Sequence, residues 1–263
     1  MSRSDLEVAA ALAEEAGRLL LDLRAAPGLT GPELGARGDA ESNALLLRRL
    51  AAERPDDAVL SEEGGTSADR SRADRVWIVD PLDGTREYAM PGRDDWAVHV
   101  ALWERGREIT AAAVAQPALG AVYAGGAGYA GGAVYPGGAV YPGGTVAAAP
   151  AGPRVLLVSD SRPPPFAADV AAAIGAEVRP MGSAGAKAMA VLRGEAIAYV
   201  HAGGQWEWDS AAPVGVALAA GLHASRIDGA ALAYNSAHPY LPDLLICHPS
   251  VAAALLAALA RHS

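Results

Sequence analysis

Cysteine is almost absent from this sequence of 263 residues, which contains only Cys247. A single cysteine excludes an intramolecular disulfide bond and a zinc site built from cysteine ligands. Cys247 ends the apolar run at 244–247. We therefore expect it to be a buried core residue and not a nucleophile.

Basic residues are also few. Lys and Arg together number 21 against 30 Asp and Glu, the formal net charge is −9, and no segment is rich in Lys or Arg. A protein that binds duplex nucleic acid needs a basic face to neutralise phosphates, so this class of function is excluded. An acidic protein with an anionic substrate would need bound cations to reverse the local charge, and this gives weak support to a metal enzyme.

Long uninterrupted apolar runs are missing as well. The N-terminus has no cationic segment followed by an apolar stretch, which a signal peptide requires. The alanine-rich C-terminal segment contains no run long enough to span a bilayer. We therefore expect a cytoplasmic protein without a membrane as partner.

Apolar residues are abundant, at 51% of the chain, and charged residues make up only 19%, which is typical of a compact globular protein. The length allows one large domain or two lobes. Segments with strand and helix patterns alternate repeatedly, and this mixture predicts a layered α/β architecture. We place a boundary near Pro153, which gives an N-terminal lobe at 1–152 and a C-terminal lobe at 153–263.

The first part of the chain predicts two helices. Ser4 and Glu7 form a capping box, and apolar residues then recur at helical spacing to about Arg24. Gly and Pro residues at 27–38 predict a loop, and a second helix follows at 40–53. Further strands are expected at 58–60, 76–79, 96–103, 108–116, 155–158, 196–200 and 244–247, and further helices at 166–174, 183–193, 210–220 and 249–262.

Residues 121–144 contain a short repeat, with AVYAGG at 121–126 and AVYPGG at 133–138 and 139–144. The period is too short and the copies are too few for a solenoid. A phosphate-binding loop would end in Gly-Lys-Ser/Thr between a strand and a helix, and the repeat has neither feature. We expect a flexible surface excursion, which is a candidate for a homodimer contact.

The pattern most indicative of chemistry is WIVDPLDGTREY at 77–88. Its apolar first half predicts a buried strand, which Pro81 should end, and Gly84 permits a tight turn. Asp80 and Asp83 would thus project from a strand end, where two carboxylates can offer hard oxygen ligands to divalent cations. The alternative is a strand followed by a solvated turn, which Asp-Gly alone would suggest.

Two other acidic segments give this motif its context: SEEGG at 61–65, after a short apolar run, and WEWDSAAP at 206–213. In this order and spacing the three segments resemble the inositol monophosphatase family of metal-dependent phosphatases, and the match covers nearly the whole chain. DPLDGTREY, GRDDWAVHVALW and WEWDSAA are most similar to the bacterial branch that acts on 3′-phosphoadenosine 5′-phosphate (PAP). The resemblance implies an α-β-α-β-α sandwich with a metal site between two lobes.

The family pattern, carried over residue by residue, implies a set of ligands for two or three Mg²⁺ ions. Glu62, Asp80 and the backbone carbonyl of Leu82 would hold the first ion. Asp80, Asp83 and Asp209 would hold the second, with Asp80 bridging the two. A third, weaker ion would bind Glu62 and water molecules.

The same resemblance implies catalytic roles for Thr85, Asp39 and Glu62. Thr85 would orient the attacking water on the metal bound by Glu62, and Asp39 would accept a proton or hold the water network. Backbone donors of Gly84 and Thr85 would bind phosphate oxygens. The duller alternatives are that Thr85 and Asp39 only cap helices. The Thr-x-Ala-Asp of the family is replaced here by the sequence 36–39, Ala-Arg-Gly-Asp, so one threonine of that network is missing.

The residues expected to contact the substrate are inferred from shorter matches to the PAP phosphatase branch. Ser183 and Lys187 fit the Gly-Ser-x-x-x-Lys segment that helps PAP phosphatases bind nucleotide, and Asp83 and Asp209 would also face the substrate. Arg162 could pair with a second phosphate, since guanidinium recognises phosphate in a bidentate way. Its surroundings depart from the Ser-Arg-Ser-His segment often found in the PAP branch, because three prolines follow Arg162.

The sequence therefore predicts a Mg²⁺-dependent phosphomonoesterase that converts PAP to AMP, removes a by-product of sulfate assimilation and is inhibited by Li⁺. Inositol 1-phosphate and fructose 1,6-bisphosphate are the rival substrates, and a loose pocket would accept all three. DGTREY favours PAP, because the inositol branch usually has Thr-Asn-Phe after Asp-Gly. A non-catalytic metal-binding protein with the same fold is the alternative from another class.

Overall fold

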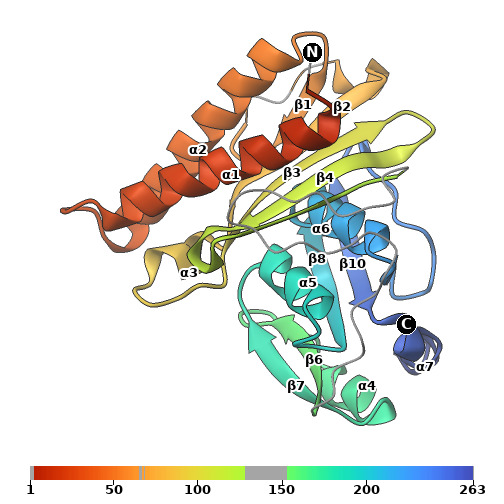
Figure 1. The fold of residues 1–263 in the computed structure, drawn as a ribbon. Helices are drawn as coiled ribbons and strands as arrows, with labels where there is room; N and C mark the ends of the chain where they lie inside the picture. Colours follow the sequence, from red (N-terminus) through yellow and green to blue (C-terminus); the bar gives the residue numbers. More distant parts are fainter. Residues whose placement is uncertain (1–2, 65–66, 68, 128–152, 263) are drawn as a thin grey trace.

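Two five-stranded β-sheets, separated by a pair of helices, form the frame of the protein in the residues that the computed structural model describes, 3–64, 67, 69–127 and 153–262 (Figure 1). The first sheet has the order β1-β2-β3-β4-β5, with β1 and β2 parallel and the other neighbours antiparallel. Its strands are β1 (Ala58–Ser61), β2 (Arg75–Asp83), β3 (Ala97–Glu104), β4 (Glu108–Gln116) and β5 (Ala121–Gly125).

The second sheet has the order β7-β6-β8-β10-β9 and mixes parallel with antiparallel pairs. β6 pairs in parallel with both β7 and β8, and β10 pairs antiparallel with β8 and β9. Its strands are β6 (Arg154–Ser159), β7 (Ala176–Met181), β8 (Ala198–Trp206), β9 (His223–Ser225) and β10 (Tyr240–Cys247).

Helices complete a five-layer arrangement. In Figure 1 the long helices α1 (Asp5–Ala25) and α2 (Gly31–Glu53) cover the outer face of the first sheet, and α5 (Ala184–Leu192) and α6 (Glu207–Ala219) lie between the sheets. The helices α4 (Ala167–Ala173) and α7 (Pro249–Leu259) pack on the remaining face of the second sheet. The expected α-β-α-β-α sandwich is confirmed. The short elements are α3 (Thr85–Ala89), η1 (Arg70–Arg72) and η2 (Pro117–Leu119).

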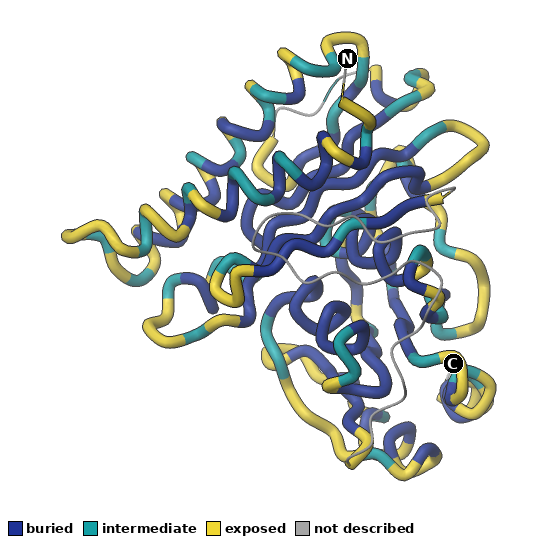
Figure 2. The backbone as a smooth tube through the Cα atoms, viewed as in Figure 1, coloured by how far each residue is buried: buried dark blue, intermediate teal, exposed yellow. Residues whose placement is uncertain are grey.

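Apolar side chains fill the spaces between these layers, and Figure 2 shows the strands of the first sheet as largely buried. Cys247 is fully buried in the layer between the second sheet and its outer helices, as expected of a core residue. In the described part of the chain no helix combines the length and apolar character that crossing a membrane requires.

The loop expected at 27–38 is wrong for most of its length, because α2 already begins at Gly31. Pro32 lies in the first turn, where a missing N–H costs nothing. Gly35 and Gly38 lie inside the helix, at positions where it packs closely on the segment that follows β2. A Cβ at Gly35 would lie 2.9 Å from Thr85, and one at Gly38 would lie 2.9 Å from Tyr88, so a larger residue would clash at either position. These glycines reflect close packing, and the sequence pattern suggested chain breaks instead.

The expectation that Pro81 ends its strand is also wrong. β2 continues to Asp83, and its pairing with β3 is irregular between Asp80 and Asp83. The missing N–H of Pro81 is accommodated in this irregular stretch, and its carbonyl accepts a hydrogen bond from the Ser42 hydroxyl at 2.7 Å. The turn comes at Gly84, whose φ of +90° favours glycine.

The repeat at 121–144 was expected to be a surface excursion. Its first copy instead forms β5, whereas the copies at 133–144 lie outside the described residues.

Strand β7 was not expected, because most of its residues are exposed and lack an alternating pattern. The lobe boundary proposed near Pro153 adjoins residues 128–152, which are outside the described residues, so the two-lobe division stays a prediction.

Candidate active site

Three aspartates from distant parts of the chain meet between the two sheets. Asp80 and Asp83 lie at the end of β2, and Asp209 lies in the first turn of α6. Each offers a carboxylate oxygen, and these oxygens all lie within 4.8 Å of one another. The backbone N–H of Trp206 donates to the Asp209 Oδ2 at 2.6 Å, which fixes one side of this carboxylate.

Glu62 joins the aspartates because β1 and β2 run parallel. Ser61 is paired with Val79, so the residues that follow both strands emerge at the same edge of the sheet. The carboxyl groups of Glu62 and Asp80 are close enough to share a hydrogen bond. The structure thus brings together the four acidic residues that the sequence singled out.

These carboxylates repel one another. Burial and the negative charge of Glu62 raise the pKa of Asp80 well above its usual range. Burial and the charge of Asp83 raise the pKa of Asp209 to about 6. Burial of its carboxyl group and the charge of Asp209 raise the pKa of Glu62 to about 7, although the residue as a whole is solvent-exposed.

Asp83 differs from the other three because donors surround it. Its Oδ1 accepts from the Ala184 N–H at 3.1 Å, and its Oδ2 accepts from the Gly185 N–H at 2.7 Å and from the Ser183 hydroxyl. These donors belong to the N-terminus of α5, which favours a negative charge. Burial alone would raise the pKa of Asp83, but the charge of His99 and the Ser183 hydroxyl lower it to about 2.

His99 is a site residue that the sequence reasoning missed. It lies on β3, is fully buried, and places Nε2 3.1 Å from the Asp83 Oδ2 and Nδ1 3.1 Å from the Trp208 carbonyl oxygen. A Cβ at Gly185 would lie 2.1 Å from His99 Nε2, so this position of α5 requires glycine. The available signal was a histidine in the middle of an apolar strand pattern.

Thr85 and Asp39 lie together at the border of the site. The Thr85 hydroxyl is 3.2 Å from the Asp39 Oδ1 and 3.2 Å from the Leu82 carbonyl oxygen, and both can accept its single proton. Burial and the charge of Glu63 raise the pKa of Asp39 to about 7, and the bond from Thr85 opposes this rise. Asp39 is inside α2 and is not its N-cap, so the plain capping role considered for it is wrong.

The donor set fits divalent cations. Carboxylate and carbonyl oxygens are the ligands that hard cations prefer, and burial together with the neighbouring negative charges raises the pKa values of Glu62, Asp80 and Asp209. The carbonyl of Leu82, between Asp80 and Asp83 at the end of β2, accepts a hydrogen bond from Thr85. These residues can therefore hold a metal ion.

A cavity of about 330 Å³, which we call the site cavity, opens beside the aspartates. Residues 83–87, at the end of β2 and in α3, form what we call its first-sheet wall. Residues 159–162 after β6, with Tyr199, His201 and Gln205 of β8, form its second-sheet wall. Asp209 and the start of α5 line the space between the walls.

Lys187, the only lysine in the sequence, lines this cavity but is almost completely buried. Its ammonium group donates to the carbonyl oxygens of Met181, Gly182 and Ser183. Burial lowers the pKa of Lys187 to about 8, although the charge of Asp83 opposes this. The expected contact between Lys187 and substrate stays a prediction. In the structure the ammonium group of Lys187 stabilises the loop before α5 through these three hydrogen bonds.

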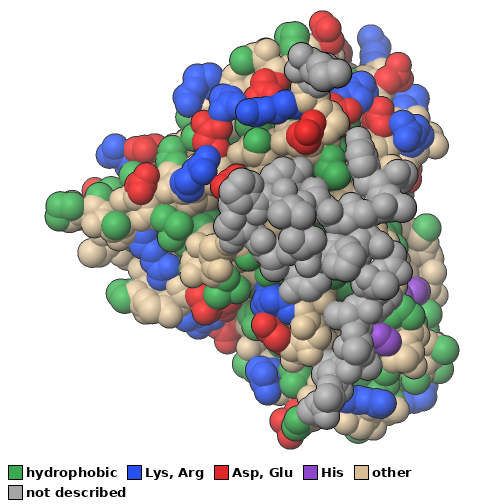
Figure 3. All heavy atoms as spheres, in the orientation of Figure 1, with side chains coloured by type: hydrophobic (Ala, Val, Ile, Leu, Met, Phe, Trp, Pro, Cys, Tyr) green, Lys and Arg blue, Asp and Glu red, His purple; other side chains and the backbone are tan. Residues whose placement is uncertain are grey.

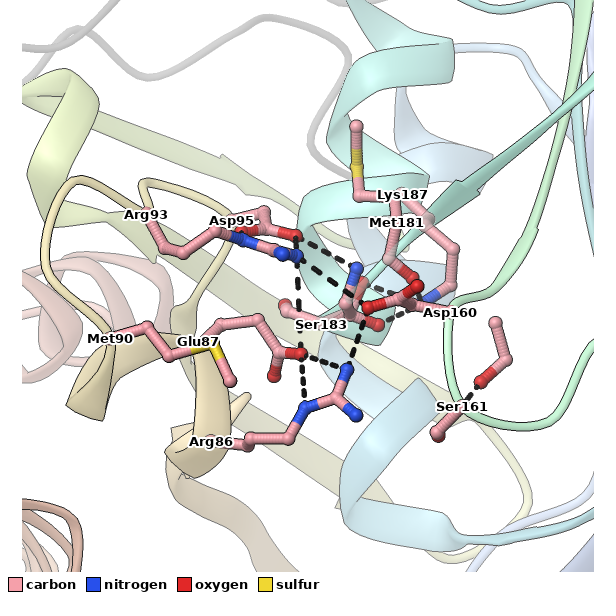
Figure 4. Close-up of polar contacts among 12 residues, drawn as sticks. Arg86, Glu87, Met90, Arg93, Asp95, Asp160, Ser161, Met181, Ser183 and Lys187 are labelled. Atoms are coloured by element: carbon pink, nitrogen blue, oxygen red, sulfur yellow. Dashed lines mark hydrogen bonds and ion pairs between the residues drawn. The ribbon is translucent and has the colours of Figure 1, made fainter. Parts of the chain in front are cut away.

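Ion pairs connect the two walls (Figure 4). Arg86, in the first-sheet wall, donates to Glu87 at 2.6 Å and to Asp160, in the second-sheet wall, at 2.7 Å. Beside this pair Asp95 accepts from the Gly182 N–H at 2.8 Å, and Arg93 donates to Asp95. The guanidinium group of Arg162 has no partner among the described residues and is exposed at the cavity.

Away from the site, basic and acidic side chains are interspersed over α1 and α2 in the view of Figure 3.

Comparison with known proteins identifies the family of this chain. The model of the inositol monophosphatase family matches residues 3–263. The chain belongs to the inositol monophosphatase family. It is similar to a protein of Mycobacterium bovis named 3′-phosphoadenosine 5′-phosphate phosphatase, with 54% identity over 94% of this chain and 90% of that protein. A protein of the same name from Mycobacterium leprae is 50% identical over 96% of this chain and 92% of its own length.

Among solved structures, the fold is similar to that of CysQ from Bacteroides thetaiotaomicron, a bacterial member of the same family. The TM-score is 0.75 at 25% identity, and the match covers 92% of this chain and 96% of that one. The family membership makes this protein a phosphatase by class.

Proposed function

We propose that this protein is a Mg²⁺-dependent phosphomonoesterase that removes the 3′-phosphate of PAP to give AMP and phosphate. The observation that carries the proposal is the meeting of Glu62, Asp80, Asp83 and Asp209, of which Asp83 and Asp209 line the site cavity. A volume of about 330 Å³ is at the lower end of the range for small-molecule sites.

The cation ligands would be those that the family pattern implies. Glu62, Asp80 and the Leu82 carbonyl would hold one Mg²⁺ ion, and Asp80, Asp83 and Asp209 a second. Glu62 would also take part in holding a third, weaker ion. Bound there, Mg²⁺ would neutralise phosphate charge and lower the pKa of a water molecule. Phosphate monoesters hydrolyse extremely slowly without such help.

The remaining groups would position the reactants. The Thr85 hydroxyl, held between Asp39 and the Leu82 carbonyl, would orient the attacking water. Asp39, whose pKa is raised to about 7, is suited to accept a proton from that water near neutral pH. The N–H groups of Gly84 and Thr85, at the start of α3, would donate to phosphate oxygens.

The choice of PAP draws support from the second-sheet wall. The exposed guanidinium of Arg162 is free to pair with the 5′-phosphate, which inositol 1-phosphate lacks. The two mycobacterial relatives named as PAP phosphatases, at 54% and 50% identity, point to the same substrate. Ser183, in contrast, already donates to Asp83, so its part in binding would be to hold that carboxylate.

The test is a comparison of kcat/KM for PAP, inositol 1-phosphate and fructose 1,6-bisphosphate, with Mg²⁺ and with EDTA. We expect PAP to be the best substrate, EDTA to abolish turnover, and tens of millimolar Li⁺ to inhibit it. Equal or better turnover of inositol 1-phosphate would refute the choice of PAP. Binding of Mg²⁺ with no phosphate release from any of the three compounds would favour the non-catalytic alternative.

A further inference from the structure

The carboxamide of Gln205, on the second-sheet wall, has no hydrogen-bond partner among the described residues. The residue lies near the end of β8, lines the site cavity and is only 5% exposed. Its Nε2 is buried without an acceptor, and its Oε1 accepts no hydrogen bond from the described residues. An unpaired buried polar group is unfavourable, and a ligand in the cavity can supply its partners.

Other polar groups near Gln205 are already used within the protein. The His201 Nε2 lies 2.9 Å from the Gly204 carbonyl oxygen, and the ammonium group of Lys187 donates to three carbonyl oxygens. The Ser159 hydroxyl accepts from the Arg162 N–H at 3.2 Å. The guanidinium of Arg162, which is cationic, and the carboxamide of Gln205, which is neutral, make no hydrogen bond to the described residues and line the cavity, so both can bind a ligand.

A carboxamide presents one donor and one acceptor side by side. Phosphate oxygens only accept, so a phosphate would leave the Gln205 Oε1 unpaired. Adenine offers an amino donor beside a ring nitrogen that accepts, and glutamine pairs with this edge in a bidentate way. The terminal torsion of glutamine is broad, so the carboxamide can turn to direct both atoms into the cavity.

We propose that Gln205 recognises the adenine base of the substrate, with Nε2 donating to a ring nitrogen and Oε1 accepting from the 6-amino group. This inference rests on the function proposed above and deepens it. Arg162 would then bind the second phosphate and Gln205 the base, so the second-sheet wall selects the leaving group while the carboxylates act on the phosphate that is removed.

The test compares PAP with the 3′,5′-bisphosphate of purine riboside, which lacks only the 6-amino group. The wild-type protein should prefer PAP in kcat/KM by about tenfold, the usual effect of losing one hydrogen bond that leaves its buried partner unpaired. Gln205→Met keeps the length of the side chain and removes both polar atoms. In this variant kcat/KM for PAP should fall about tenfold, and the preference over the purine analogue should disappear.

Turnover of 2-glycerophosphate, which has no base, is the control for the fold and the cation site. The variant should hydrolyse it as the wild type does. If the wild type hydrolyses PAP but does not distinguish it from the analogue, or if Gln205→Met lowers all three activities equally, the role of Gln205 is refuted and the proposed function stands. If the wild type hydrolyses 2-glycerophosphate but not PAP, the proposed function fails.

Discussion

The two walls of the site cavity are built in different ways. The first-sheet wall is one continuous segment, 83–87, in which a strand end, a glycine turn and a short helix follow each other directly. The second-sheet wall collects residues from the end of β6 and from three separate positions on β8. Of the four carboxylates only Asp83 belongs to the continuous segment of the first-sheet wall, and the fold brings Glu62, Asp80 and Asp209 beside it.

Electrostatics separates the walls further. Burial and the mutual repulsion of the carboxylates beside the first-sheet wall raise the pKa of Asp80, Asp209 and Glu62. Asp83 is the exception, because His99 and the N-terminus of α5 stabilise its charge. On the second-sheet wall, in contrast, the guanidinium of Arg162 and the carboxamide of Gln205 have no hydrogen-bond or ion-pair partner among the described residues. The carboxylates are thus suited to bind cations. On the second-sheet wall Arg162 is suited to bind an anion, and Gln205 is suited to hydrogen-bond a heterocyclic base.

The largest effect should come from the carboxylate side. Asp209→Asn removes a charge that cations need but keeps the size of the side chain, so we expect at least a thousandfold loss of kcat with Mg²⁺ and a folded protein. Steady-state phosphate release and circular dichroism check this. Asp243→Asn, at a carboxylate that pairs with Arg226 outside the site cavity, is the matched control and should retain kcat. Normal turnover by Asp209→Asn would show that the ligand assignment is wrong.

A second prediction concerns Lys187. The sequence predicts that Lys187 contacts the substrate, whereas in the structure it stabilises the loop before α5. Lys187→Met would leave the carbonyl oxygens of Met181, Gly182 and Ser183 without their donor. We expect the free energy of unfolding to fall by about 2 kcal/mol, the cost of unpaired buried groups. Urea denaturation measures this fall. Unchanged stability with a much higher KM for PAP would instead favour direct contact between Lys187 and substrate.

The smallest effect concerns pH and the metal-free protein. Because the folded pKa values of Glu62 and Asp209 are raised to about 7 and about 6, the folded state binds more protons than the unfolded state between about pH 4 and pH 7. Stability without metal should therefore fall as pH rises through this window. Saturating Mg²⁺ should reduce this slope, because bound cations favour the charged carboxylates.

Calorimetric melting temperatures at pH 5, 6, 7 and 8, with EDTA or with Mg²⁺, measure this slope. Asp83 should not contribute in this range, since its pKa is lowered to about 2 and its stabilising charge is lost only on acidification toward that value. A melting temperature in EDTA that rises from pH 5 to pH 7 would contradict the proposed repulsion among the carboxylates.

Much of the carboxylate side was predictable from the sequence. Asp80 and Asp83 stand in one short motif, and the segments with Glu62 and Asp209 matched the family in order and spacing. His99 was missed because its partners, Asp83 and the Trp208 carbonyl, are brought to it only by the folded chain. Gln205 was missed for the related reason that an unpaired amide becomes visible only when its surroundings are known.

The errors in secondary structure have the same origin. Pro32, Gly35 and Gly38 suggested a loop, because local propensity makes them chain breakers. In the fold Pro32 occupies the first turn of α2, and the glycines allow the helix to approach Thr85 and Tyr88. Packing against the segment 85–88 thus overrides propensity, and it also places Asp39 beside Thr85 and not at the expected helix cap.

The central claim is that four carboxylates together hold divalent cations, and anomalous scattering from crystals grown with Mn²⁺ tests it most directly. We expect strong peaks within coordination distance of Asp80, Asp83 and Asp209, and a further peak between Asp80 and Glu62. Manganese bound only elsewhere, with these carboxylates free of any ion at saturating Mn²⁺, would contradict the account.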